Sequence, residues 1–179
     1  TIPAGSTTGL ISVVTPCGTA NSLSNFSSEI TLNLKVFIEG FYSAVNTMRA
    51  PLGGSNCDTI EVRLATSASP YTIMYTVKGI INTSGNGVFT FPGSALGNSY
   101  YIIVKHRNSL ETWSGSAIPF PSTSNSFDFT TLVTQAFGGI QVQVSTGKWA
   151  IRSGDVNQDG AINTSDYSFL QTTLSSFVV

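Results

Sequence analysis

The 179-residue sequence predicts an all-β protein, an antiparallel sandwich with one short helix at its C-terminus. Short stretches in which apolar and polar residues alternate recur along the chain, and this period of two is typical of half-buried strands. Turn signals rich in Gly, Asn and Pro separate these stretches about every 8–12 residues, as in immunoglobulin-like or prealbumin-like β-sandwiches. Strand and helix patterns do not alternate, so a parallel sheet is not expected.

The pattern divides the chain into three parts. Residues 1–30 are rich in Ser, Thr, Asn and Gly and form an extended segment with one short strand at 10–14. Residues 31–151 form the sandwich, and residues 152–179 form the final loop and helix. The strands expected within the sandwich are residues 32–42, 59–66, 71–80, 87–91, 99–106, 126–131, 139–145 and 147–151.

The helix is expected over residues 164–177. Leu170, Leu174 and Phe177 fall at i, i+4 and i+7 on one face, and Tyr167 lies one turn earlier. This apolar face is expected to dock the helix on one end of the sandwich.

Composition excludes several classes of function. Charged residues make up only 9% of the chain, and the 8 basic and 9 acidic side chains give a net charge of −1. The sequence therefore lacks the basic patch that nucleic acid requires. It also lacks the run of about 18 apolar residues that spans a membrane. The 25 Ser and 22 Thr residues supply most of the polarity. Since the sequence begins at Thr1 without a leader, we expect a mature secreted product or a segment of a larger chain.

Two cysteines, Cys17 and Cys57, lie in loop-like surroundings without the spacing of a zinc site. In an exported protein they predict a disulfide, which would stabilise the fold by about 3–4 kcal/mol. The alternative is two unpaired thiols in loops.

Acidic residues are concentrated near the C-terminus, where residues 155–166 hold three of the nine. The stretch matches the spacing D-x-N-x-D-G, with a further carboxylate at position twelve. Gly160 allows the sharp turn, and Ile162 is expected to hold the loop to the core. The pattern predicts a Ca²⁺ site, and the alternative is a solvated turn in which Asp166 only begins the helix. The expected ligands are Asp155, Asn157, Asp159, the carbonyl of Ala161, Asn163 and Asp166.

The stretch GDVNQDGAINTSDYSFLQTTL resembles a single repeat of a type I dockerin, an EF-hand-like calcium loop followed directly by a helix. A full dockerin has two such repeats that bind a cohesin, and this sequence contains one. Thr164 and Ser165 occupy loop positions where that family often places its recognition residues. Residues 31–151 are similar to β-sandwich modules of large bacterial cell-surface proteins, often exported by the type IX route. The resemblance implies an exported, non-catalytic, modular protein.

Aromatic residues near a small polar cluster form a second candidate site. They could stack against a sugar, whereas the simpler interpretation is a strand end with outward charges and core aromatics. The candidate ligand contacts are Tyr100, Tyr101, His106, Trp113 and Trp149. No nucleophile motif, zinc-binding helix motif or second carboxylate pair occurs, so enzyme activity is not expected.

Together these patterns predict a secreted, calcium-stabilised structural or adhesive module at a cell surface. It would be part of a larger assembly or filament, in which a terminal segment could add a strand to a neighbouring copy. The alternative function is a carbohydrate-binding module that recognises a glycan.

Overall fold

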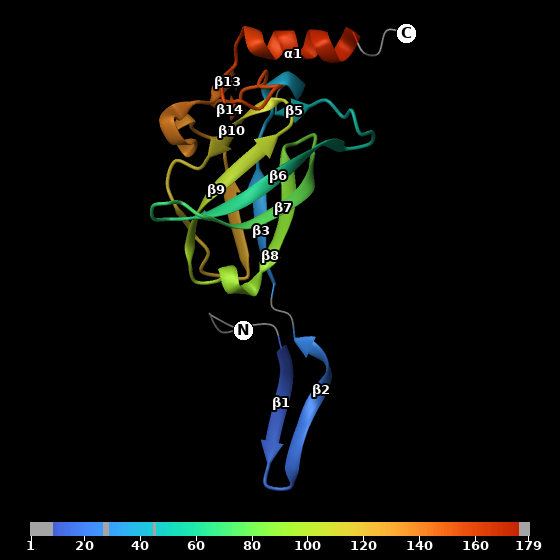
Figure 1. Cartoon of the computed structure of the whole chain (residues 1–179), viewed down its shortest axis with the longest axis vertical. Coiled ribbons are helices and arrows are strands. Elements are labelled where there is room, and N and C mark those ends of the chain that lie inside the picture. Colours follow the sequence, from blue (N-terminus) through green and yellow to red (C-terminus); the bar gives the residue numbers. More distant parts are fainter. Residues whose placement is uncertain (1–8, 27–28, 45, 176–179) are drawn as a thin grey trace.

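The structure is a computed structural model that describes residues 9–26, 29–44 and 46–175 (Figure 1). In these residues the protein is mostly β, with several antiparallel sheets and one α-helix, as predicted. The strands are β1 (Gly9–Thr15), β2 (Gly18–Phe26), β3 (Glu29–Lys35), β4 (Tyr42–Ala44), β5 (Thr47–Met48), β6 (Asn56–Thr66), β7 (Ile73–Asn82), β8 (Asn86–Pro92), β9 (Ser99–His106), β10 (Ser109–Trp113), β11 (Ile118–Pro119), β12 (Ser124–Asp128), β13 (Val142–Ser145) and β14 (Lys148–Ala150). The helices are the 3-10 turns η1 (Glu39–Phe41), η2 (Gly93–Ala95), η3 (Val133–Gln135) and η4 (Phe137–Gly139), and α1 (Thr164–Ser175).

Two sheets enclose the hydrophobic core. The larger has the order β10-β9-β6-β7, with β11 paired to β9, and the smaller has the order β12-β3-β8. Leu32 of β3, Val62 of β6 and Phe89 of β8 are buried in one common cluster. Successive side chains of a strand point to opposite faces of the sheet, so every second residue faces the core. The burial pattern of β8 shows this, because every second residue is buried.

One strand pairing differs from the prediction. β12 lies parallel to β3, with Ser124 opposite Thr31 and Asp128 opposite Lys35. A tight turn forces its two strands to be antiparallel, but β12 reaches β3 through a long connection. The preceding strand, β11, belongs to the other sheet. The direction of β12 was therefore not readable from its own sequence.

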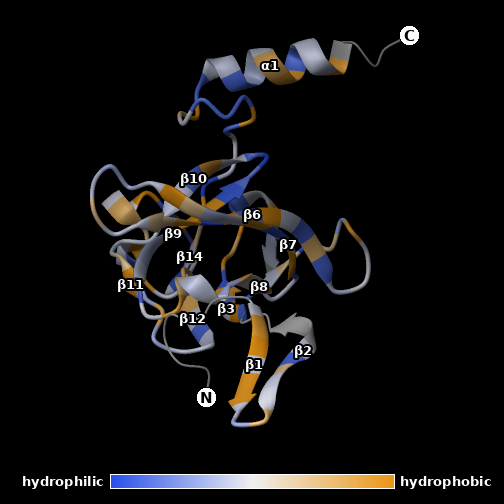
Figure 2. Cartoon of the chain, turned by 60° about the horizontal axis from the view of Figure 1, so that its bottom comes forward, coloured by the Kyte–Doolittle hydropathy of each residue, from blue (hydrophilic) through white to orange (hydrophobic). Residues whose placement is uncertain are grey.

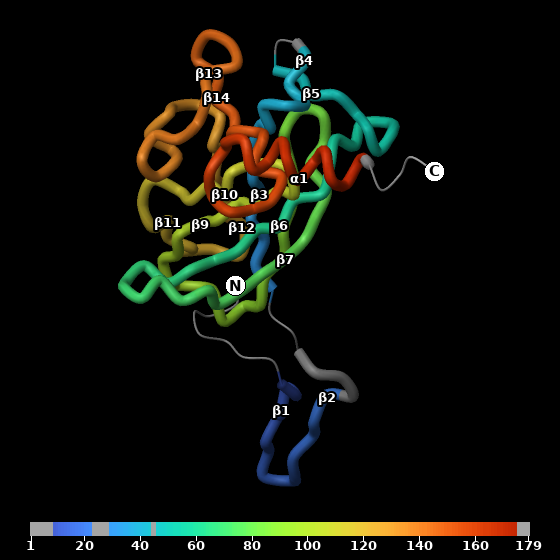
Figure 3. The backbone as a smooth tube through the Cα atoms, turned by 45° about the horizontal axis from the view of Figure 1, so that its top comes forward, coloured from blue at the N-terminus to red at the C-terminus, as the bar shows by residue number. Residues whose placement is uncertain are grey.

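Two elements extend beyond opposite ends of the sandwich (Figure 1). Figure 3 shows the β1–β2 hairpin projecting from the rest of the chain. At one end β1 and β2 form an antiparallel hairpin, in which Thr15 pairs with Gly18. The sequence predicted only one strand in this part. At the other end the loop of residues 151–163 leads to α1.

The predicted docking of α1 on the sandwich is wrong. Its large apolar side chains are exposed, and Ile162 is 45% exposed. The γ-methyl of Ile162 lies against Gly154 in the same loop rather than in the core. The predicted Phe177 lies outside the described residues. The exposed apolar residues of α1 are Tyr167, Phe169, Leu170 and Leu174.

The predicted disulfide is absent, since Cys17 and Cys57 are both free thiols. Cys17 lies exposed in the turn of the β1–β2 hairpin, away from the sandwich. Cys57 is buried in the core, with its Sγ 4.0 Å from the Sδ of Met48. The projecting hairpin thus keeps the two thiols apart.

Candidate functional site

The predicted calcium loop is joined to the sandwich by backbone hydrogen bonds. The Ile151 N–H donates to the Phe37 carbonyl over 2.8 Å, and the Gly154 N–H donates to the Asn108 carbonyl over 2.9 Å. The Ser153 N–H donates to the Glu39 side chain over 3.0 Å. These bonds fix the start of the loop even though α1 itself is exposed.

Within the loop, oxygens of the first two predicted ligands point inward. The Asp155 carboxylate accepts hydrogen bonds from the Asp159 N–H over 3.1 Å and the Gly160 N–H over 3.2 Å. The Asn157 side-chain oxygen accepts a bond from the same Asp159 N–H over 3.0 Å. Gly160 has φ +85°, a left-handed conformation that glycine adopts without strain. The chain therefore turns around Asp155 as a cation-binding loop requires.

Asp166 joins the loop to the first turn of α1. Its carboxylate accepts bonds from the N–H groups of Asn163 at 2.9 Å, Val156 at 2.8 Å and Asn157 at 3.2 Å. These bonds, that of Asn163 first, lower the pKa of Asp166 against the opposing effect of desolvation. The Asn163 side chain in turn accepts the Ser165 N–H over 2.7 Å, so Asn163 is the N-cap of α1. Asp166 therefore caps the start of α1, as the alternative interpretation of a solvated turn before a helix also expects.

Burial and charge bear on the choice between a cation loop and a simple turn. Asp155 is 2% exposed and Asp166 is 4% exposed. Among the described residues, no Lys, Arg or His lies within ion-pair distance of either carboxylate. The sequence also has no basic residue after Arg152. Since buried charges are normally paired or coordinate metals, these carboxylates fit a bound cation.

The arrangement suits calcium better than zinc. Within the described residues, no three His, Cys, Asp or Glu side chains converge closely enough to hold a metal by themselves. The Asp159 carboxylate accepts bonds from the Asn157 amide at 2.8 Å and the Ser165 hydroxyl at 3.2 Å. Calcium also takes amide and backbone carbonyl oxygens, and Asn157, Ala161 and Asn163 supply these in the sequence.

The second candidate site is an aromatic hollow of about 320 Å³ on the larger sheet. Of the aromatic residues predicted to contact a ligand, it contains Tyr101 and Trp113, whose ring centroids are 6.0 Å apart. Tyr71 lies edge-on to both, at 5.7 Å from Tyr101 and 6.5 Å from Trp113. Exposed Phe137 completes the lining.

Local backbone geometry places the two lining residues that the sequence analysis missed. Tyr71 has φ +56°, an unusual conformation for a bulky residue that is often found at ligand sites. Phe137 follows Ala136, which forms a β-bridge with Ser114. A Cβ atom at Gly115 would lie 2.2 Å from the Thr134 carbonyl oxygen, so the close approach of this loop requires glycine. The signal for Phe137 in the sequence was an aromatic residue directly before two glycines, Gly138 and Gly139.

The other predicted ligand contacts lie elsewhere. Tyr100 faces the core, with its ring centroid 5.7 Å from that of Phe120. Trp149 lies on β14 and does not line the hollow. His106 is buried on the end of β9. These three residues do not form a site with Tyr101 and Trp113.

His106 belongs to a buried polar network. Its Nδ1 lies 3.0 Å from the Ser109 Oγ, and its Nε2 lies 3.3 Å from the Asp58 Oδ2. Burial lowers the pKa of His106, although Asp58 opposes this shift. Burial alone would raise the pKa of Asp58, but bonds from Thr59, Arg107 and His106 outweigh it and lower that pKa.

The residue types of this network match a serine nucleophile with its base and orienting acid. However, Ser109 has no exposed surface, so no substrate can reach its hydroxyl. The Ser109 Oγ instead lies 3.5 Å from the Ser153 Oγ, and the Ser109 carbonyl accepts a bond from the Gln158 amide over 3.3 Å. The network thus connects the sandwich to the candidate calcium loop.

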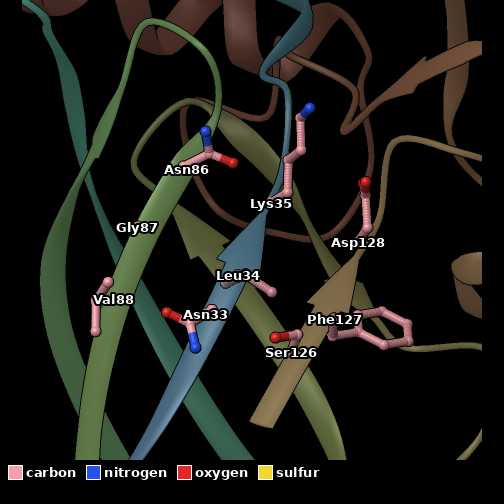
Figure 4. Close-up of a pocket in the computed structure, with 9 residues that line it drawn as sticks. All are labelled: Asn33, Leu34, Lys35, Asn86, Gly87, Val88, Ser126, Phe127 and Asp128. Atoms are coloured by element: carbon pink, nitrogen blue, oxygen red, sulfur yellow. The ribbon is translucent and has the colours of Figure 1, made fainter. Parts of the chain in front are cut away.

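A third candidate site is a hollow of about 530 Å³ on the smaller sheet (Figure 4). Lys35 and Asp128 are its charged lining residues. The Lys35 ammonium lies 5.7 Å from the centroid of the Phe37 ring, and the Asp128 carboxylate accepts the Thr130 N–H over 2.7 Å. Both charged groups already have protein partners, so this hollow is a weaker candidate than the other two sites.

In the part of the chain that the structure describes, no helix is long and apolar enough to cross a membrane. Comparisons with protein-family models, curated proteins and solved structures found no match to this chain.

Proposed function

We propose that this chain is a non-catalytic, calcium-stabilised structural or adhesive module of an extracellular, cell-surface assembly. One observation carries the proposal: Asp155 and Asp166 are buried, with no cationic partner among the described residues, in a loop with calcium-ligand spacing. The loop lies between the sandwich and α1, so a bound ion would stiffen that junction.

The finer aspects of the proposal are an immunoglobulin-like or prealbumin-like sandwich and a dockerin-like C-terminus. The uncovered apolar side chains of α1 support a role in assembly, because an exposed apolar face is typical of partner-binding surfaces. The burial of Ser109 supports a non-catalytic role.

Calorimetric titration of the full chain with Ca²⁺ tests this function. We expect about one ion per chain. Asp155→Asn should weaken calcium binding at least about tenfold, because it removes a charged ligand. Glu29→Gln, which removes an exposed carboxylate from β3, should bind like the wild type. Wild-type protein without calcium binding, or equal effects of the two substitutions, would overturn the proposal.

A second candidate function is carbohydrate binding, which the aromatic hollow favours. Tyr71, Tyr101 and Trp113 present ring faces and edges around one space, and the Glu111 carboxylate accepts the Trp113 indole N–H over 2.8 Å. Sugar rings offer apolar C–H faces for aromatic stacking, and mostly apolar lining with few polar groups is typical of ligand sites.

A glycan array followed by affinity measurements tests this candidate. We expect Trp113→Ala to weaken the binding of any glycan hit at least tenfold (about 1.4 kcal/mol). Trp149→Ala is the matched control, because Trp149 lies outside the hollow. An array without hits, or equal losses in both variants, contradicts carbohydrate binding at this site.

A further inference from the structure

The β1–β2 hairpin presents an apolar strand with a free edge. In the described residues β1 pairs with β2 alone, so its other edge has unpaired N–H and C=O groups. Leu10, Ile11, Val13 and Val14 are each more than half exposed. Figure 2 shows β1 as hydrophobic along most of its length and projecting from the sandwich. An isolated two-stranded hairpin is only marginally stable in water, so β1 needs a partner.

The hairpin also lacks the features with which proteins block edge strands. Such edges usually carry charged side chains, especially Lys, or are covered by other elements. The first charged residue of this chain is Glu29, so β1 and β2 contain none. By contrast, the exposed edge strand β7 carries Lys78. A partner for β1 must therefore be an uncharged, apolar strand.

The sequence of β1 is complementary to itself. Leu10 and Ile11 precede Ser12, and Val13 and Val14 follow it, so the apolar pattern is symmetric about Ser12. Two copies that meet through the same strand edge must run antiparallel around a two-fold axis. With Ser12 opposite its symmetry mate, Ile11 lies opposite Val13 of the other copy, and Leu10 lies opposite Val14.

We propose that the free edge of β1 pairs antiparallel with β1 of a second copy of this chain, centred on Ser12. The product is a four-stranded sheet of order β2-β1-β1-β2, in which all four apolar side chains of each β1 gain apolar neighbours. Because the paired hairpins run in opposite directions, the two sandwiches lie at opposite ends of the new sheet. This pairing goes beyond the proposed calcium-dependent function and does not depend on it.

Light scattering across a concentration series tests the dimer. We expect the wild type to be dimeric both with calcium and with chelator, so failure of the calcium proposal leaves this result unchanged. Val13→Lys should raise the dimer Kd at least tenfold, because it places a charge at the paired edge. Val88→Lys is the matched control, since Val88 is an exposed valine of the sandwich, 64% exposed against 57% for Val13. A monomeric wild type, or equal dissociation by both substitutions, overturns the proposal.

Cysteine crosslinking tests the register. In a Cys17→Ser background, Ser12→Cys should form an intermolecular disulfide under mild oxidation, because directly opposite residues lie within disulfide range. Thr19→Cys in the same background should not crosslink, because Thr19 lies on β2, outside the central pair. Absence of the Ser12→Cys crosslink, or equal crosslinking by both variants, contradicts this register.

Discussion

The two ends of the molecule expose apolar residues in different electrostatic settings. The N-terminal hairpin has no charged residue, whereas the segment after Arg152 has three Asp residues and no basic one. The hairpin can therefore gain stability by burying apolar strands, and the C-terminal loop can gain it by binding a cation. The sandwich between them has its own buried core, so each end should respond separately to its own partner.

The largest change in the free energy of unfolding is expected from a substitution in the core of the sandwich, which lies between the two ends. Phe89→Ala should lower the free energy of unfolding by about 3–5 kcal/mol, because Phe89 is fully buried between the sheets. Val88→Ala, at the exposed neighbouring position, should change it by less than about 0.5 kcal/mol. Urea denaturation measures both values. Similar losses would mean that the outer face of β8 is covered in solution.

The next effect is confined to the C-terminal end. If the loop binds calcium as proposed, a calcium concentration of about 100 times Kd should stabilise it by about 2.7 kcal/mol through ligand linkage. Amide exchange at Asp159 and Gly160, whose N–H groups bond to Asp155, should then slow about a hundredfold. Exchange in β1 and β2 should stay unchanged. Equal slowing at both ends would show that the ends are coupled.

The sandwich was predictable from the sequence because its strands carry a local signal. In β3, β6 and β8, apolar residues alternate, and the structure buries them as expected. The parallel direction of β12 was not predictable, because it depends on a connection between two sheets. The second strand of the hairpin was missed, because β2 is rich in Ser and Asn and lacks apolar alternation.

The candidate sites also divide into one with a local sequence signal and one that depends on contacts between distant segments. The loop of residues 155–166 has a local spacing that the sequence shows directly, while its ligands and its metal stay a prediction. The aromatic hollow gathers Tyr71, Tyr101, Trp113 and Phe137 from separate segments. Only Tyr101 and Trp113 were found from the sequence, since neither the left-handed turn at Tyr71 nor the contact of the Phe137 loop with Ser114 has a periodic signal.

A smaller effect is expected when the pH is lowered. Burial lowers the pKa of His106 below its ordinary value of 6.5, so the unfolded chain binds a proton that the folded chain does not. Stability should therefore fall as the pH drops below 6.5, by at most about 1.4 kcal/mol per pH unit. The pKa of Asp58 is also lowered, from 3.8, so its contribution is present above pH 3.8 and is lost at lower pH.

The control for this pH effect is His106→Gln, in which the loss that begins near pH 6.5 should disappear. Urea denaturation between pH 7.5 and 5 measures both proteins. Amide exchange should show the acid effect around Ser109 and Ser153, where the network meets the C-terminal loop. An unchanged pH profile in His106→Gln would assign the effect to other groups.

The smallest expected effect is a difference in thiol reactivity between the hairpin and the core. Counting the reactive thiols measures it without any change in stability. Burial, with a further contribution from Asp58, raises the pKa of Cys57 to about 11. At pH 8 only about one Cys57 in a thousand is then a thiolate, the form that reacts, and its side chain is shielded from the reagent. Cys17 is exposed in the hairpin turn.

A thiol reagent should therefore label one thiol in the folded chain and two in denaturant, and Cys17→Ser should leave none reactive before unfolding. Two thiols reacting in the folded wild type would show that the core opens around Cys57, whereas none would show that the turn of the hairpin is covered.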